Sequence, residues 1–256
     1  MITLLSIMLL GFFLGMRHAT DPDHVIAVTT IVSRERSIFH AAIIGAIWGL
    51  GHTVTISLVG SAIILFKLEI PPRLGLSMEL SVGFMLILLG VLNLTGAMQR
   101  AIEWIAIRRL GPGAHAHFIF GRRVVHTHEE DGDPVVEPAW WNKLSVFQMA
   151  RPLAVGIVHG LAGSAAVALL VLTTINRPAW AVAYLLIFGL GTVAGMMLIT
   201  AAIALPFAYT VQRFGQLNRG LVMASGFLSL AFGLFLCYQI GFVDGLFTGH
   251  ANWVPR

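Results

Sequence analysis

Two imidazoles and two carboxylates fall within one short stretch near the N-terminus, RHATDPDH at 17–24, between apolar residues 1–16 and 25–32. Ionisable groups inside an apolar membrane segment are costly and by default mark an ion path or a polar site. Neutral imidazole with carboxylate suits Ni²⁺, Co²⁺ or Zn²⁺ better than Mg²⁺ or Ca²⁺, which prefer oxygen ligands. The stretch therefore predicts a transition-metal site. The alternative is that an aspartate pairs with Arg17 and the imidazoles only form hydrogen bonds.

The spacing of His18, Asp23 and His24 would scatter these side chains around an unbroken helix, at ~100° per residue. Pro22 cannot donate to a helical ladder, and the preceding Asp21 is biased away from the helical region. We expect Asp21 to be the N-cap and Pro22 the first residue of a second half-helix. The break would let the side chains face one ion. Asp21 is itself a lower-ranked candidate ligand.

Two more histidines in apolar segments are candidates. His52 follows Gly51 in GLGHTVT, where glycines allow close helix approach. We predict that His52 is the fourth ligand, against the alternative of a hydrogen-bonded contact between helices. His159 lies in GIVHGLAGSAA (156–166), whose residues are small and carry no carboxylate. It is a candidate ligand or supporting group, or else an interhelical hydrogen-bonding residue.

The composition is that of an integral membrane protein. Of 256 residues, 57% are hydrophobic and only 11% are charged, against about a quarter in soluble domains. One cysteine allows neither a disulfide nor a thiolate cluster. No GxxxxGK[ST] motif is present, which disfavours ATP-driven transport by this chain alone. We interpret the net charge of +4 by the placement of Lys and Arg around a membrane, so we expect no nucleic-acid partner. We also expect no prosthetic group.

The hydropathy pattern predicts about six apolar segments, at 2–32, 38–66, 76–98, 146–175, 179–208 and 218–242. Most Lys and Arg residues then fall on one side of the membrane. By the positive-inside rule this side is cytoplasmic, and both termini lie outside a bacterial-type inner membrane.

The two halves of the chain resemble each other. GMRHA (15–19) matches GIVHG (156–160) at an offset of 141, and WGLGHTV (48–54) matches FGLGTVA (188–194) at an offset of 140. Three spans per half is an odd number, so the second half must be inverted, which is a transporter architecture. We predict an all-α integral membrane protein of about six transmembrane helices in two inverted three-helix repeats.

The first repeat would cover residues 1–98 and the second 146–256. Residues 99–145 would form a cytoplasmic loop that begins with an interfacial helix at 101–110. This loop is rich in histidine and acidic residues. Its composition predicts either low-affinity metal capture or a solvated segment that does not bind metal. The candidate loop ligands are His115, His117, His126 and His128.

The spacing H-x4-D-H at 18–24 resembles the signature of the nickel/cobalt transporter (NiCoT) family of secondary permeases. That family also carries a histidine in an LGH[ST] motif on the next helix, matched here by LGHT at 50–53. The resemblance is strongest over about 15–95. Many family members have a further span before the signature helix and an acidic motif in the second half, which is not evident here. The resemblance implies that four residues recognise the metal, namely His18, Asp23, His24 and His52.

Together these features predict a secondary transporter that moves Ni²⁺ or Co²⁺, with Zn²⁺ also compatible, across the inner membrane. Uptake and efflux both stay open. A second hypothesis is a membrane accessory protein that delivers nickel to urease or hydrogenase maturation proteins. A third is an anion transporter that uses Arg17 and Arg151 as binding groups. An enzyme is not expected, because no separate general base or nucleophile accompanies the metal ligands.

Overall fold

The structure is a computed structural model that describes residues 4–68, 70–97, 100, 115–119, 122–126, 149–162, 175, 177–248 and 251–253. In the described part of the apolar segments the secondary structure is helical. Among the described residues, four helices are long and apolar enough to cross a membrane, judged by length and composition. They are α3 (Ile38–Phe66), α4 (Pro72–Thr95), α7 (Pro178–Arg213) and α8 (Gly215–Tyr238), the last continued by a π-helix, η1 (Gln239–Val243).

Prolines and small residues set the ends of these helices. α4 and α7 each begin with proline, at Pro72 and Pro178, where a missing N–H costs nothing. α3 begins after Ser37, whose hydroxyl accepts a hydrogen bond from the backbone N–H of His40. α4 ends at Gly96, which adopts a left-handed backbone with φ of 64°. Local sequence thus fixes where the long helices start and stop.

The first apolar segment forms two short helices, α1 (Leu4–His18) and α2 (Pro22–Val32). At 1.5 Å per residue, the 11 residues of α2 reach about 16 Å, roughly half of a bilayer core. Most of the α2 side chains are buried, and α2 packs against α4, α7 and α8. The predicted break and the second half-helix are therefore confirmed.

The fourth predicted segment is described only in part, as a helix over Met149–Ala162. The remainder of that segment and the predicted interfacial helix at 101–110 lie outside the described residues. The number of spans consequently stays a prediction.

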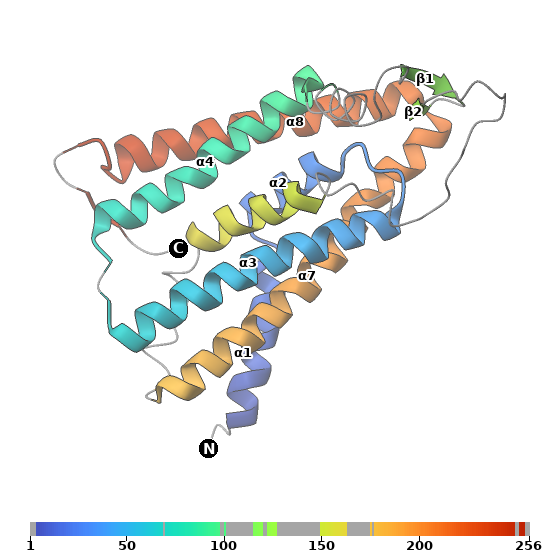
Figure 1. Ribbon diagram of the computed structural model, residues 1–256. Coiled ribbons are helices and arrows are strands. Elements are labelled where there is room, and N and C mark those ends of the chain that lie inside the picture. Colours follow the sequence, from blue (N-terminus) through green and yellow to red (C-terminus); the bar gives the residue numbers. More distant parts are fainter. Residues whose placement is uncertain are drawn as a thin grey trace.

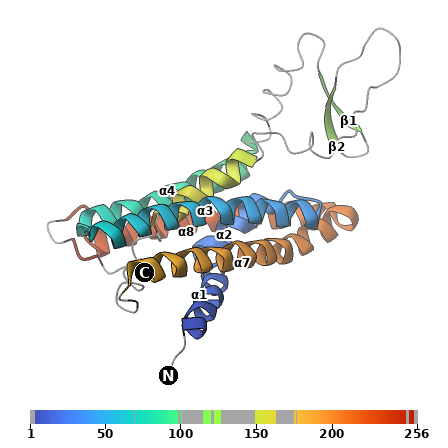
Figure 2. The same ribbon diagram turned by 60° about the horizontal axis from the view of Figure 1, so that its bottom comes forward.

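The polar stretch between the two halves, which was predicted as a loop, contains two short strands. Two strands, β1 (His115–Ile119) and β2 (Arg122–His126), pair as an antiparallel hairpin. The aromatic and β-branched residues of HAHFI and RRVVH, namely Phe118, Ile119, Val124 and Val125, favour strands over helix. The region predicted as a loop therefore contains a short hairpin that the sequence analysis did not predict, and Figure 2 shows it apart from the helices.

The long helices pack in pairs, α3 with α7 and α4 with α8, and α1 crosses α7 (Figure 1). Glycines permit backbone contact between α4 and α8. A Cβ atom at Gly90 would lie 2.8 Å from the carbonyl oxygen of Gly226, and one at Gly233 would lie 2.8 Å from that of Gly83. Small residues at such crossings are typical of packing between membrane helices.

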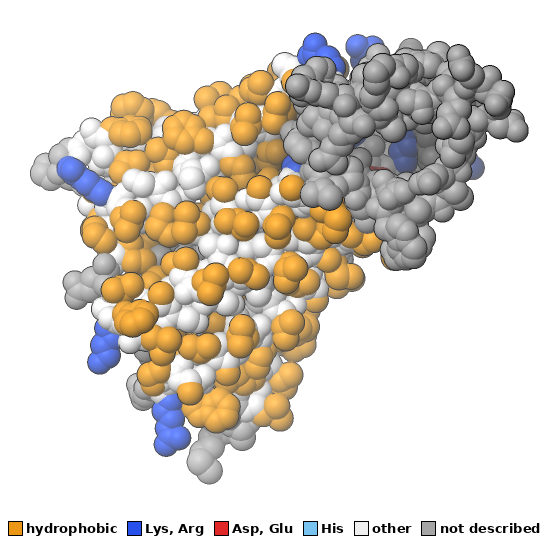
Figure 3. Space-filling view, viewed as in Figure 1, with side chains coloured by type: hydrophobic (Ala, Val, Ile, Leu, Met, Phe, Trp, Pro, Cys, Tyr) orange, Lys and Arg blue, Asp and Glu red, His pale blue; other side chains and the backbone are white. Residues whose placement is uncertain are grey.

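The outer surface of the helices is apolar. Leu58, Phe84 and Leu190 are each exposed by 59% or more, and Figure 3 shows hydrophobic side chains over the whole visible helical face. A soluble monomer rarely exposes a continuous apolar surface of this extent. The chain is therefore a multi-pass membrane protein whose exposed side chains contact lipid.

Candidate metal site

The helix break lies between His18 and Pro22 and separates the residues of the signature into two helices. Asp21 is the N-cap of α2, with an extended backbone (φ −60°, ψ 144°). Its backbone N–H donates to the carbonyl of His18 at 3.1 Å and closes the turn. Because the helical path is interrupted here, His18 and His24 can point to the same place.

The side chain of Asp21 contacts His18 and makes no capping hydrogen bond to α2. One carboxylate oxygen, Oδ2, lies 2.7 Å from Nδ1 of His18. We assign the proton of His18 to Nδ1, since a carboxylate accepts there, and this leaves the Nε2 lone pair for an ion. Asp21 thus lies behind an imidazole, in the place where carboxylates commonly orient metal-binding histidines.

Three imidazoles from three helices converge at the break. His18 ends α1, His24 lies in the first turn of α2, and His52 lies in the middle of α3. One ring nitrogen from each lies within 4.8 Å of the others, and the Nε2 atoms of His18 and His52 are 3.1 Å apart. Two nitrogens bound to one ion at about 2.1 Å each lie about 3 to 3.5 Å apart. The separation fits a shared ion.

A second group shares His24 with the first. Asp23 Oδ1 lies 3.1 Å from Nδ1 of His24, and Oδ2 of the same carboxylate lies 3.4 Å from Nε2 of His159. The latter pair is within charge-pair distance but lacks hydrogen-bond geometry. The structure therefore brings His159 into the cluster beside Asp23 and His24.

Several nitrogens of this cluster are buried without a hydrogen-bond partner in the described part of the chain. They are Nε2 of His24, Nδ1 of His52 and both ring nitrogens of His159. Leaving a buried polar atom unsatisfied costs about 1–3 kcal/mol. The three residues are at most 3% exposed. An ion held by imidazole nitrogens would offset part of this cost.

Two aromatic rings flank the imidazoles, and sequence reasoning missed both. The indole of Trp48 stacks on His24, with ring centroids 5.8 Å apart and an interplanar angle of 14°, and lies 5.4 Å from the ring of His159. Phe188 lies 5.6 Å from the ring of His18. The signal was present in the sequence, since both residues open the matched motifs WGLGHTV and FGLGTVA. These rings limit water around the cluster.

Glycines let the flanking helices approach the cluster. A Cβ atom at Gly15 would collide with the carbonyl of Phe188, and one at Gly156 would collide with the carbonyl of Trp48. The two contacts correspond to each other in the sequence matches, because Gly15 aligns with Gly156 and Trp48 aligns with Phe188. In each half of the chain, a glycine therefore packs against the backbone carbonyl of the corresponding aromatic residue, Phe188 or Trp48, in the other half.

The loop histidines are only partly placed. His115 and His126 are paired across the β-hairpin, and His117 is paired with Val124. His128 lies outside the described residues. The backbone thus brings two of the four candidate loop ligands opposite each other, and their role as ligands stays a prediction.

The donor set of the buried cluster consists of imidazole nitrogens and one carboxylate. Such a set suits borderline divalent transition metals, whereas Mg²⁺ and Ca²⁺ favour oxygen shells. Its burial among apolar helices would require an entering ion to exchange water for side-chain ligands. The geometry therefore supports binding of a cation such as Ni²⁺, Co²⁺ or Zn²⁺.

Comparison with known proteins gives one relative of nearly full length. The chain is 33% identical over 246 residues to the urease accessory protein UreH of Bacillus sp. (strain TB-90), and the match covers 96% of each chain. No family model matches the chain. No solved structure matches it either.

Proposed function

The chain belongs to the family of the urease accessory protein UreH, and from that membership we propose that it is a secondary transporter of nickel in a membrane. UreH belongs to the nickel/cobalt transporter family that the two histidine motifs resemble. A urease accessory role implies handling of nickel, and the multi-pass apolar helices imply that this happens in a bilayer. The observation that carries the proposal is the buried cluster of four histidines and one aspartate at a helix break.

In this proposal His18, His24 and His52 form the first ligand set, and Asp21 orients His18 through its Nδ1 atom. The more exposed His18 would meet the ion first, because its side chain is 18% exposed while those of the other two are almost fully buried. Asp23 adds negative charge beside His24, which favours a dication over the bare imidazoles. The ion would shed water as these ligands replace it.

The second group, with Asp23, His24 and His159, would receive the ion next. His24 belongs to both groups, so the ion could pass without leaving this imidazole. Imidazole and carboxylate must be deprotonated to bind metal, so protons compete with the ion. We expect a proton gradient or the membrane potential to assist release.

Inverted repeats would give this cluster access to both sides of the membrane in turn. The reciprocal contacts Gly15–Phe188 and Gly156–Trp48 support a pseudo-two-fold relation between the halves. So do the α4–α8 contacts, in which Gly90 meets Gly226 and Gly233 meets Gly83. These glycines correspond to each other because the pattern GF-x5-G occurs at both 83–90 and 226–233. The proposal also includes six spans, a cytoplasmic loop and termini outside the membrane. It leaves the direction of transport, uptake or efflux, open.

A second candidate function follows from the description of the relative as a urease accessory protein. In that case the chain would bind nickel for delivery to urease maturation proteins without moving it across the membrane. Sealed proteoliposomes with a nickel-sensitive dye inside, compared with equilibrium dialysis of the detergent-purified chain, separate the two. Dye response with nickel binding supports transport. Nickel binding without any dye response supports the accessory role and overturns transport.

A further inference from the structure

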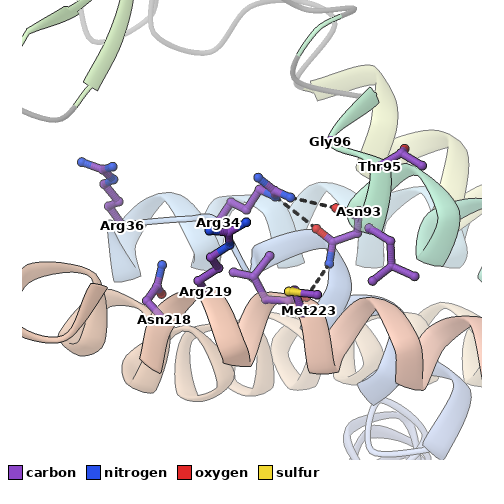
Figure 4. Close-up of a pocket in the computed structure, with 10 residues that line it drawn as sticks. Arg34, Arg36, Asn93, Thr95, Gly96, Asn218, Arg219 and Met223 are labelled. Carbon is purple, nitrogen blue, oxygen red and sulfur yellow. Dashed lines mark hydrogen bonds between the residues drawn. The ribbon is translucent and has the colours of Figure 1, made fainter. Parts of the chain in front are cut away.

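A second polar site lies at the other end of α2 from the histidine cluster. It is a cavity of about 530 Å³ between the residues after α2, the end of α4 and the start of α8. Figure 4 shows side chains from all three segments around it. The lining includes three guanidinium groups and two amides but, among the described residues, no carboxylate; these side chains are Arg34, Arg36, Asn93, Asn218 and Arg219.

One guanidinium of this arginine pocket is held in place by an amide. Nε of Arg34 donates to Oδ1 of Asn93 at 3.1 Å, and Nη2 donates to the Asn93 carbonyl at 2.7 Å. Asn93 is buried, and its Nδ2 donates to the Val222 carbonyl and to Oγ of Ser225, both at 3.1 Å. A preorganised side chain loses less conformational entropy when a ligand binds.

The charge of the pocket is strongly positive. Arg34, Arg36 and Arg219 line one cavity, and Arg151 on the neighbouring helix Met149–Ala162 is close enough to interact electrostatically with Arg34. Guanidinium groups that line one cavity offer several charged N–H donors to an anion that enters it. The guanidinium fork matches the oxygens of a phosphate group in particular.

Basic residues at a membrane surface need no pocket to satisfy the positive-inside rule. Here three of them converge on one cavity, and a buried amide fixes one of the three. The volume falls within the range of about 300–1,000 Å³ that is typical of small-ligand sites. We propose that the arginine pocket binds a phosphate-bearing anion, which is either the headgroup of an anionic phospholipid or free inorganic phosphate.

The test uses the full chain in nanodiscs and measures the melting temperature at constant ionic strength. One arm compares phosphatidylcholine discs with discs that contain phosphatidylglycerol, and the other titrates inorganic phosphate into phosphatidylcholine discs. Native mass spectrometry counts any retained anionic lipid. Stabilisation in the first arm identifies a headgroup, and stabilisation in the second identifies free phosphate.

The diagnostic variant is Arg36→Gln/Arg219→Gln, because both residues are exposed and both line the pocket. Its melting temperature without added anion shows whether the fold is retained. Its charge-matched control is Arg177→Gln/Arg213→Gln, outside the pocket lining, where Arg213 stacks over Tyr209. We expect anion affinity to fall by about tenfold or more in the first variant and to stay unchanged in the control. Equal affinity in the two variants, or no stabilisation by either anion, would overturn the proposal. The anion-binding test does not measure metal flux, so its failure would not contradict the proposed nickel transport.

Discussion

The Nε2 atoms of His18 and His52 lie 3.1 Å apart, although one residue ends α1 and the other lies in the middle of α3. Two neutral imidazoles can satisfy only one hydrogen bond at such a contact. A divalent ion between the nitrogens would instead use both lone pairs. The first proposed ligand set is built around this contact between His18 and His52.

Asp21 is expected to tune the metal site through His18. Asp21→Asn keeps a good N-cap residue for α2 but removes the carboxylate from Nδ1 of His18. We predict that nickel affinity falls by about 10–100-fold, as is usual when the partner of a metal-binding histidine is removed. Isothermal titration measures the affinity, and the melting temperature of the metal-free protein should change little. Unaltered affinity would mean that the Asp21 carboxylate does not tune His18 as a ligand.

His159 should matter more for movement of the ion than for its first capture. The three imidazoles of His18, His24 and His52 remain in His159→Gln, whereas the group around Asp23 loses a ligand. We predict that nickel flux falls by about tenfold or more while equilibrium affinity changes by less than that. Parallel flux and dialysis measurements on the same preparation give the ratio. An equal loss in both would place His159 in the first ligand set, and no loss in either would remove it from the path.

Trp48 offers an optical report on the cluster, because its ring lies against His24 and His159. Binding of paramagnetic Ni²⁺ or Co²⁺ beside these imidazoles should quench its fluorescence. Trp48→Phe keeps an aromatic ring there and should remove most of the metal-dependent quenching. Trp180→Phe, a change at a half-exposed residue near the start of α7, is the control and should retain it. Quenching that survives in Trp48→Phe would place the bound metal elsewhere.

The reciprocal glycine contacts predict similar penalties in the two halves. A methyl group at Gly15 or at Gly156 would collide with a backbone carbonyl, so each Ala variant should lose about 1–3 kcal/mol of stability. Gly220→Ala is the control, since a Cβ there meets nothing within 4 Å and alanine is the better helix former. Thermal unfolding in detergent measures the three variants. Full stability of Gly15→Ala or Gly156→Ala would contradict the packing described for these helices.

Sequence reasoning located the break because proline has a fixed local effect that does not depend on the rest of the fold. The break predicted that His18 and His24 could face one ion, and the structure groups these two imidazoles with His52. Asp23 lies in the second group, with His24 and His159, so the four predicted ligands do not form one set, and their role as ligands stays a prediction. The position of His159 beside Asp23 depends on how the two halves cross, which residue types alone do not specify.

Other features of the structure could not be predicted from local sequence patterns. In the sequence, Trp48 and Phe188 are indistinguishable from other apolar residues of membrane helices. Only the fold shows that their rings contact the imidazoles of His24 and His18. The arginine pocket joins segments far apart in the chain, so the basic residues were counted for topology and not as a site. The hairpin was missed because its two short strands, HAHFI and RRVVH, do not alternate apolar and polar residues regularly.

The central claim is that nickel crosses the membrane through the cluster that His24 shares between its two ligand groups. Nickel flux into proteoliposomes should be compared for wild type, His24→Ala and His40→Ala, the last a histidine of α3 that lies outside both groups. The account predicts flux in wild type and His40→Ala, and leakage comparable to empty liposomes in His24→Ala with its melting transition retained. Wild-type flux in a folded His24→Ala protein would contradict it.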